Sequence, residues 1–251
     1  AESRSARVEF ERVADLTVDR VITRLRQHVA VLRAARGLFA ARDGAVSRAE
    51  FQGFLDSVDL AHEFPGAQGV GFARMIAAGE EAAAEDEIAR HYGRRVEVRP
   101  PAAAARQTPI VLLEPADERN LHALGYDMYS EPARRAAMDA AVARGGAQIS
   151  APVELVQDTG EDRLAGFLIY LPYVTPGAEG GAEGFVYAPF RGRDLIEAAL
   201  AAGPPLPVAF SITDTAAPER PIFDDRAGVP SGMTLSRTVE VLGRTWAFEL
   251  H

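Results

Sequence analysis

The stretch that decides the fold runs from Asn120 to Pro172 and reads NLHALGYDMYSEPARRAAMDAAVARGGAQISAPVELVQDTGEDRLAGFLIYLP. Ser130 is a favoured N-cap residue, Glu131-Pro132 suit a first helical turn, and Gly145-Gly146 are a typical stop signal. Together these signals predict a helix of about three to four turns after Tyr126-Asp127.

Two β-strands are expected after that helix. Residues 149–155 alternate weakly between apolar and polar side chains, and residues 166–171 form a dense apolar run. The polar residues 157–163 lie between them. This pattern predicts a strand, a loop and a buried strand.

The first 42 residues predict one long helix. Residues 5–42 contain no proline, and their apolar residues recur at steps of mostly three or four. This apolar stripe consists of Val13, Leu16, Val21, Leu25, Val29, Leu32 and Phe39. At 1.5 Å per residue the helix would run about 55 Å, nearly twice the width of a small domain, so we expect it to support two stacked modules.

Further elements follow from local signals. Asp43-Gly44 ends the long helix, and Ser47 with Glu50 forms a capping box that opens a second helix. Strands are expected at residues 68–76, 95–99, 109–113 and 185–187, and helices at residues 80–92 and 193–201. After residue 205, strands are expected at residues 208–213, 234–242 and 245–250. The last two would form a hairpin through Gly243-Arg244.

Composition excludes several kinds of chemistry. The 251 residues include no cysteine, so disulfides, thiol catalysis and cysteine metal sites are excluded. All 27 basic residues are arginine, which removes P-loop, Schiff-base and general-base lysines. The net charge of −9 argues against nucleic acid or anionic lipid as the main partner, because a phosphate-binding surface needs clustered excess positive charge.

No pattern in the sequence supports an enzyme. The four histidines before residue 130 are scattered, without an HExxH motif or a nearby carboxylate cluster. No GxSxG occurs, and the glycine-rich pieces do not follow the GxGxxG order. We therefore predict no catalytic residues, no metal site and no cofactor.

Membrane insertion of this stretch is not expected, because no run approaches the roughly eighteen apolar residues that a spanning helix needs. The chain starts at Ala1 and shows no signal-peptide pattern, so we expect it to be an excised or processed piece of a longer protein.

Several pieces of the sequence together resemble one family, the CHASE domain, which is the extracytoplasmic sensory domain of histidine kinases and nucleotide cyclases. The pieces that carry the resemblance are RGLFA at residues 36–40, VSRAEF at 46–51, FPG at 64–66, GVGFA at 69–73, the segment 120–172, and GFVYAPFR at 184–191. Their order and spacing cover most of the chain. The part after Pro204 matches only loosely.

The resemblance implies an α+β fold in which the long N-terminal helix backs two PAS-like modules with antiparallel sheets. Residues 1–60 would form the first two helices, residues 61–192 the membrane-distal ligand-binding module, and residues 193–251 the membrane-proximal module. The resemblance also implies membrane spans before Ala1 and after about Leu250. The domain would then lie on the periplasmic face of a bacterial inner membrane, with a histidine kinase or diguanylate cyclase as the output domain outside this chain.

Asp127 is the first candidate for ligand binding. It lies between aromatic residues just before a helix, where its carboxylate could accept hydrogen bonds from a ligand. The alternative is a capping or solvated role, because aspartate is common at turns. The resemblance adds that an aspartate at the matching position contacts an adenine-like ring in the plant cytokinin-receptor branch. Tyr187 and Ala188 stand where that branch carries small glycines, so a differently shaped cavity is expected and a plant hormone is not inferred.

The remaining candidates would line the same cavity. Leu168 and Tyr170 alternate on one strand and Phe185 and Tyr187 on the next, while each could equally be ordinary core. The full predicted ligand-binding set is Tyr126, Asp127, Ile149, Leu168, Tyr170, Phe185 and Tyr187. Four arginines could meet a carboxylate or phosphate or could simply lie on the surface. They are Arg134, Arg135, Arg191 and Arg193.

Two hypotheses about function remain open. The first is a non-catalytic sensor that binds a small organic molecule, such as a purine-like compound, and relays a helix displacement through the membrane. The second is a dimerisation or partner-protein module without a small-molecule ligand, in which the apolar stripe pairs two chains. A homodimer through the N-terminal helix and no nucleic-acid partner are expected in either case.

Overall fold

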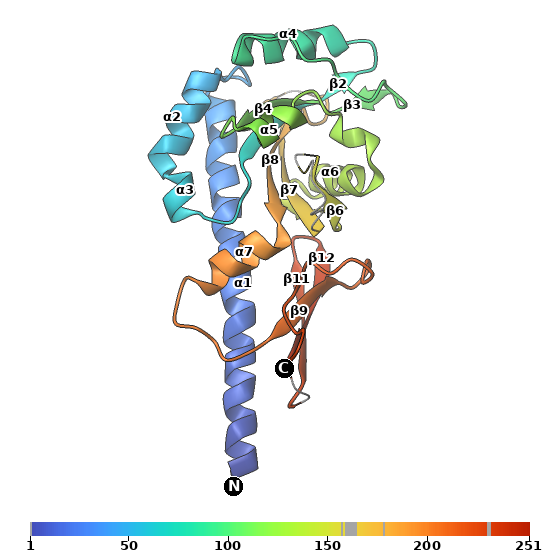
Figure 1. The fold of residues 1–251 in the computed structure, drawn as a ribbon. Coiled ribbons are helices and arrows are strands. Elements are labelled where there is room, and N and C mark those ends of the chain that lie inside the picture. Colours follow the sequence, from blue (N-terminus) through green and yellow to red (C-terminus); the bar gives the residue numbers. More distant parts are fainter. Residues whose placement is uncertain (1, 157, 159–164, 178, 230–231) are drawn as a thin grey trace.

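A single helix of 40 residues, α1 (Glu2–Ala41), runs along the molecule and carries two β-sheets on one side (Figure 1). The computed structural model describes residues 2–156, 158, 165–177, 179–229 and 232–251. The long helix predicted from the apolar periodicity is thus confirmed. The mixed helix-and-sheet architecture with antiparallel sheets is confirmed as well.

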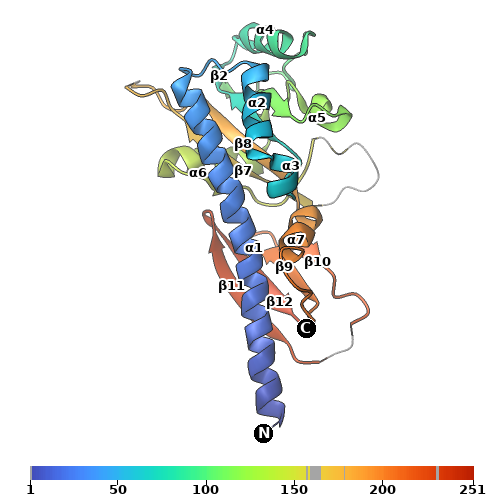
Figure 2. The same cartoon turned by 90° about the vertical axis from the view of Figure 1, so that its left-hand side faces the viewer.

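The apolar stripe of α1 packs into the core of its own chain. Val21, Leu25, Leu32 and Phe39 are buried, and α1 contacts strands of both sheets (Figure 2). The proposal that this stripe pairs two chains is therefore wrong, because the two sheets of the same chain already cover those side chains. The uncovered face of α1 carries mostly small and charged residues.

Two short helices follow α1. They are α2 (Arg48–Val58) and α3 (Leu60–Glu63). The predicted capping box is present: the Ser47 hydroxyl accepts a hydrogen bond from the Glu50 amide, and the Glu50 carboxylate accepts one from the Ser47 amide. This reciprocal pair satisfies two amides that a helix start leaves free, so the local sequence alone sufficed to place α2.

The larger sheet has six strands in the order β4-β1-β8-β7-β5, with β6 also paired to β7, and all pairs are antiparallel. Its strands are β1 (Val70–Arg74), β4 (Ile110–Glu114), β5 (Gln148–Ile149), β6 (Val153–Glu154), β7 (Ala165–Tyr173) and β8 (Gly184–Arg191). Around it lie a two-stranded piece, β2 (Ile76–Ala77) and β3 (Arg106–Gln107), the helices α4 (Glu81–Tyr92), α5 (Glu118–Ala123) and α6 (Pro132–Arg144), and the 3-10 turn η1 (Met128–Ser130).

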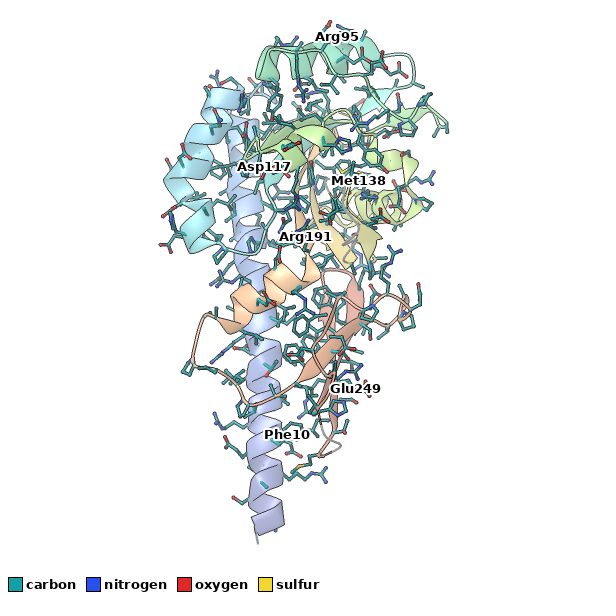
Figure 3. The ribbon with its side chains drawn as sticks, in the orientation of Figure 1. Phe10, Arg95, Asp117, Met138, Arg191 and Glu249 are labelled. Carbon is teal, nitrogen blue, oxygen red and sulfur yellow. The ribbon has the colours of Figure 1, made fainter. Side chains whose placement is uncertain are left out.

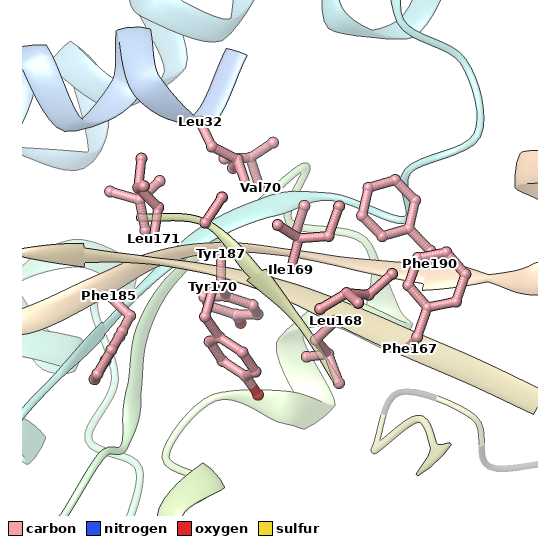
Figure 4. Packing of buried hydrophobic residues seen from close by; sticks show 14 of the residues in the cluster. Leu32, Val70, Phe167, Leu168, Ile169, Tyr170, Leu171, Phe185, Tyr187 and Phe190 are labelled. Atoms are coloured by element: carbon pink, nitrogen blue, oxygen red, sulfur yellow. The ribbon is translucent and has the colours of Figure 1, made fainter. Parts of the chain in front are cut away.

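The two faces of the larger sheet are covered by different helices (Figure 4). Ile169 and Leu171 point toward Leu32 of α1, whereas Tyr170 and Tyr187 point to the opposite face. That opposite face is covered by α6 and η1, which contact β7 directly or through Met128. The candidate site is built on this second face.

The smaller sheet has four strands in the order β10-β9-β12-β11. They are β9 (Phe210–Asp214), β10 (Phe223–Asp224), β11 (Leu235–Val241) and β12 (Arg244–Leu250), and helix α7 (Gly192–Leu200) connects them to the larger sheet. The two sheets touch where the Trp246 ring meets the edge of Phe167 at 5.4 Å between centroids. The late β-rich segment predicted from the sequence is confirmed.

Several predicted details are wrong. Glu131, not Ser130, caps α6, because its carboxylate accepts hydrogen bonds from the amides of Ala133 and Arg134. The hairpin turns through Leu242-Gly243, one residue earlier than expected, since Val241 pairs with Arg244.

The predicted strands also differ in three places. Residues 95–99 form no strand, because the Val98 amide donates to the Glu85 carboxylate rather than to a neighbouring strand. Residues 149–155 give two short strands, interrupted where the Ser150 hydroxyl accepts the Leu168 amide and where Pro152 has no amide to donate. Residues 68–76 divide into β1 and β2, while the predicted loop 157–163 lies outside the described residues except Asp158.

Candidate functional site

The floor of the candidate site consists of aromatic side chains on two neighbouring strands. Tyr170 on β7 pairs directly with Tyr187 on β8, and their rings stack with centroids 6.1 Å apart. Phe185 meets Tyr170 edge-on at 6.0 Å. The Tyr187 ring lies against Gly71 of β1, where any Cβ would come within 2.9 Å of the ring. The sheet register therefore brings three of the predicted residues together.

Asp127 lies at the edge of this floor and is buried, with 3% of its surface exposed. Its Oδ1 accepts hydrogen bonds from the amide of Thr108 at 2.6 Å and from the amide of Tyr129 at 3.0 Å. Burial raises the pKa of Asp127, and these two backbone amides oppose that shift. Asp127 thus caps η1 and ties it to the strand side of the site, which is the capping role that the sequence had left open.

The segment around Asp127 closes the site from above. The Tyr170 hydroxyl lies 3.2 Å from the Met128 sulfur, so η1 rests on the aromatic floor. Arg134 of α6 stacks over the Tyr126 ring, with 5.4 Å from its guanidinium carbon to the ring centroid. Of the predicted residues, Tyr126 and Asp127 therefore join Tyr170, Tyr187 and Phe185 on this side of the sheet.

Ile149 lies on the other face of the sheet. It pairs with Ile169, whose side chain points toward α1, and the neighbouring residue Gln148 pairs with Tyr170 instead. Leu168 is buried two residues before Tyr170 on β7, and therefore on the face of Tyr170 by strand alternation. A shift of one residue exchanges the two faces of a strand, which explains how Ile149, although in a strand as predicted, lies on the face turned toward α1.

Four buried polar atoms in this region have no hydrogen-bond partner among the described residues. They are Gln107 Oε1, Thr108 Oγ1, Arg134 Nε and the Tyr187 hydroxyl. Burial raises the pKa of Tyr187 far above its usual range, so the hydroxyl keeps its proton. Buried polar atoms in folded proteins are nearly always paired, so four unpaired ones near one aromatic floor need an explanation.

Gln107 and Thr108 were missed by the sequence reasoning. They belong to a short polar step between the exposed residues 101–106 and the apolar β4, a position that no motif distinguishes. Contacts with a segment 19 positions further along the chain reveal that they face the site: the Thr108 amide donates to Asp127, and the Thr108 carbonyl accepts the Met128 amide.

The four candidate arginines all have partners within the chain. Arg134 is buried and donates to the Glu154 carbonyl and to Glu131, while Arg135 stacks over Tyr129. Arg191, at the end of β8 (Figure 3), binds the buried carboxylate of Asp158. Arg193 is exposed and pairs with Glu197. Of these four, Arg134 is the one that stacks on a residue of the site.

None of the seven predicted residues lines any of four surface hollows of about 500 to 870 Å³ that the described residues form elsewhere. The described residues contain no group of three or more side chains able to hold a metal ion. They also contain no helix long and apolar enough to cross a membrane.

Solved structures similar to this one include ligand-binding domains of bacterial chemoreceptors. The ligand-binding domain of the Pseudomonas aeruginosa PAO1 amino acid chemoreceptor PctC, in complex with GABA, aligns with a TM-score of 0.59 at 12% identity over 98% of each chain. The periplasmic sensory domain of the Campylobacter jejuni chemoreceptor Tlp1 aligns with a TM-score of 0.54 at 7% identity, over 93% of this chain and 90% of its own.

A third similar structure is the ligand-binding domain of the Pseudomonas fluorescens chemoreceptor CtaA in complex with L-isoleucine. It aligns with a TM-score of 0.52 at 12% identity, over 100% of this chain and 94% of its own. At such low identities these structures support the PAS-like fold alone.

Comparison with curated protein sequences finds no match. The family model of the CHASE domain, in contrast, matches residues 44–223, from the end of α1 to β10 of the smaller sheet. This match spans well over half of the chain and confirms the resemblance seen in its motifs. The chain belongs to the CHASE domain family and is a sensory domain.

Proposed function

We propose that this domain binds a small polar organic molecule between the larger sheet and α6, within residues 61–192, and relays the binding event to an output domain elsewhere in the protein. The CHASE family match and the fold shared with receptor ligand-binding domains support a sensor. Residues 193–251 with α1 then form the relay toward the membrane, and the domain lies on its periplasmic side.

The observation that carries this proposal is the set of unpaired polar atoms. Gln107 Oε1 is an acceptor, Arg134 Nε is a donor, and the hydroxyls of Thr108 and Tyr187 can do either. An unpaired buried polar group costs about 1–3 kcal/mol, so a ligand that satisfies several of them would gain affinity from bonds the empty protein lacks.

The arrangement favours a ligand with both donors and acceptors. Asp127 and the Gln107 side-chain carbonyl are acceptors, whereas Arg134 Nε is a donor and the Tyr187 hydroxyl can be either. Asp127 Oδ1 already accepts two backbone amides and the Gln107 side chain also interacts with the Asp127 carboxylate, so a ligand N–H at Oδ2 would compete with Gln107. Amino acids and purines both carry such combinations. The GABA and L-isoleucine bound by two similar structures are of the first kind.

Ligand entry requires a movement at the floor, because the stacked Tyr170 and Tyr187 rings fill the space beneath η1. The ligand would act as a sensor input by stabilising a conformation in which η1 and α6 sit differently on the sheet. A ligand shifts such an equilibrium only by its difference in affinity for the two states. Relay through α7 and α1 follows from the direct contacts of α7 with β8 and with α1.

The test is a thermal-shift screen with amino acids, purines and dicarboxylates, followed by calorimetry on each hit. Thr108→Val and Tyr187→Phe each remove one unpaired hydroxyl with almost no change in shape. We expect both to weaken binding at least about tenfold without loss of stability.

The matched control is Tyr129→Phe, because Tyr129 also carries a hydroxyl near the site but bonds it to the carboxylate of Asp139. It should leave the affinity unchanged. A ligand that binds equally well to all three variants would place the site elsewhere. A screen without any hit, together with no small molecule found by mass spectrometry of the purified protein, would remove the proposal.

The alternative module hypothesis has one specific support. The face of α1 turned away from the sheets exposes Ala30, Ala34, Gly37 and Ala41, and small residues allow two helices to approach closely. We place the homodimer contact on this face rather than on the apolar stripe. Light scattering of the wild type and of Ala34→Arg tests it, since a dimer through this face should dissociate in the variant, and one that persists excludes it.

A further inference from the structure

The largest of the four surface hollows shares no lining residue with the predicted ligand-binding set, and three arginines line it. It has a volume of about 870 Å³ and lies between the α1–α2 turn, the end of β1, and α4, which crosses the top of the molecule (Figure 1). Arg48, Arg74, Arg90 and His91 all line it. This volume is in the range of small-molecule sites.

Arg48 is held in place from two sides. Its Nε donates to Glu114 Oε1 at 2.5 Å, and its guanidinium carbon lies 4.7 Å from the centroid of the Tyr92 ring. Its two terminal nitrogens form no hydrogen bond within the described residues. Arg48 therefore presents free donors to the hollow without having to be ordered first, which lowers the entropy cost of binding.

Arg74 is fixed in a similar way. It donates from Nε and Nη2 to the two oxygens of Glu87 at 2.5 and 2.8 Å, and Nη2 also reaches the Gly44 carbonyl at 3.1 Å. Its Nη1 has no partner within the described part of the chain. Glu87 is in turn 3.6 Å from His91 Nε2, which links Arg74 to the α4 side of the hollow.

Arg90 completes the set from α4. It is exposed, it lines the hollow, and it forms no hydrogen bond or ion pair among residues that the structure describes. The carboxylates that line the hollow belong to Glu87, which is bound to Arg74, and to Asp43. Arg48 is bound to Glu114, so two of the three guanidiniums already have a carboxylate partner. Arg90 is the one of the three that has no carboxylate partner among the described residues, and it lines the same hollow as Arg48 and Arg74.

We propose that this hollow is a second binding site, for the oxyanion group of a small molecule, either a phosphate or a dicarboxylate. Guanidinium nitrogens in fixed positions are suited to both, because each offers paired donors to two oxygens of the anion. The site is separate from the face that carries Tyr170 and Tyr187. Its occupation does not depend on the ligand proposed for that face.

Calorimetry at low salt with inorganic phosphate in one arm and succinate in the other tests this proposal. Low salt matters because exposed charges are screened within about 10 Å at 0.1 M. The arm with the tighter binding identifies whether the group is phosphoryl or carboxylate. Arg90→Gln should weaken binding about ten- to a hundredfold, the range for one charged hydrogen bond.

Arg94→Gln is the matched control. Arg94 is exposed just after α4 and does not line the hollow. Its replacement by glutamine removes the same charge as Arg90→Gln. The affinity of the Arg94→Gln variant for phosphate or succinate should stay within about twofold of the wild-type affinity. In addition, amide NMR signals of residues 44–49 and 87–91 should shift on phosphate or succinate addition.

Three outcomes would overturn the proposal. The first is no saturable binding of either oxyanion below about 10 mM, which is weaker than a specific site needs. The second is an equal loss in Arg90→Gln and Arg94→Gln, which would indicate general charge attraction. The third is binding with NMR shifts confined to other parts of the chain.

Discussion

Tyr170 and Tyr187 are directly paired across strands β7 and β8, yet only one of their hydroxyls has a partner among the described residues. The Tyr170 hydroxyl contacts the Met128 sulfur at 3.2 Å, whereas the buried Tyr187 hydroxyl has no partner among the described residues. One ring thus supports the cap of the site, and the other keeps an unsatisfied polar atom in the core. This difference makes Tyr187 the more informative position for mutation.

Tyr187→Phe should stabilise the ligand-free domain by about 1 kcal/mol, because it removes a buried hydroxyl that pays a desolvation cost without a hydrogen bond. Urea denaturation measures the change. Tyr170→Phe is the paired control and should be neutral or slightly destabilising, since that hydroxyl has the Met128 contact. Destabilisation of Tyr187→Phe beyond that of Tyr170→Phe would show that the Tyr187 hydroxyl is already bonded.

Asp127→Ala should destabilise the domain by about 1–3 kcal/mol, because the amides of Thr108 and Tyr129 lose their acceptor. Asp127→Asn keeps an oxygen for these amides and removes the charge, so its stability should stay within about 1 kcal/mol of the wild type. Calorimetric affinity then isolates the charge: a ligand N–H bonded to the carboxylate predicts a loss of about tenfold in Asp127→Asn. Equal stability of both variants would contradict the capping role.

The raised pKa of Asp127 should make the free energy of unfolding depend on pH. The folded state binds the proton more tightly than the unfolded state, so stability should fall as pH rises from 3.8 through the raised pKa. Urea titrations across that window should show a smaller fall in Asp127→Asn, which cannot titrate. An identical slope in the variant would assign the effect to another group.

His28 should make the domain less stable in mild acid. Burial lowers its pKa from 6.5 to about 4, while its Nε2 faces the Pro65 carbonyl at 3.3 Å. The unfolded chain therefore takes up a proton that the folded chain rejects, and stability falls as pH drops from 6.5 to about 4. The full loss is about 3 kcal/mol. His28→Phe keeps a ring against Phe190 and should flatten this part of the profile.

The control for His28 is His122→Gln, which removes an exposed histidine from α5 and should retain the wild-type slope. Chemical unfolding monitored by circular dichroism at several pH values between 4 and 7 provides the measurement. If the stability of His28→Phe falls with pH as steeply as that of the wild type, His28 does not cause the loss of stability in acid.

Glu87 should affect the stability of the domain at a lower pH than His28 does. Burial alone would raise its pKa, but the nearby His91 ring, 3.6 Å away, and the hydrogen bonds and charge of Arg74 outweigh burial and hold the pKa at about 2. Its ionised form contributes stability above pH 4.5, and this contribution is lost as pH falls from 4.5 to about 2. The expected loss is about 3 kcal/mol.

Glu87→Gln tests this assignment, because a glutamine cannot titrate. The variant should be less stable at neutral pH and should lose the steep decline between pH 4.5 and 2. Glu118→Gln, which changes an exposed carboxylate on α5, should keep that decline. A Glu87→Gln profile parallel to the wild type would show that the network with Arg74 contributes nothing to folding.

Local chemistry accounts for most helices that the sequence predicted. The Ser47–Glu50 capping box, the stop at Gly145 and the 3.6-residue periodicity of α1 depend on residues within one or two turns of each other. Errors appeared where two local solutions compete, as at the start of α6, where Glu131 with its longer side chain caps the helix in place of Ser130. Such shifts of one residue are common at helix ends.

The candidate site was predictable only in part. Alternation placed Tyr170, Tyr187 and Phe185 on one face, but the sequence could not show that β5 pairs so as to put Ile149 on the other. It left both roles of Asp127 open; the structure shows the capping role, in which Oδ1 accepts the Tyr129 amide, and ligand binding stays a prediction. No motif in the sequence indicated that Gln107 and Thr108 belong to the candidate site, since their position there depends on contacts with a segment 19 residues away.

The sequence by itself determined the long helix, the two β-rich regions and the absence of thiol and lysine chemistry, because each of these follows from composition or from short-range patterns; its motifs also carried the resemblance to the family that the family model confirms. Only the tertiary structure decided which side of α1 is covered, which face of the sheet is polar, and which arginines converge around the hollow near Arg90. Those properties arise from strand register and from contacts between residues far apart in the chain, and short-range propensities contain no information about either.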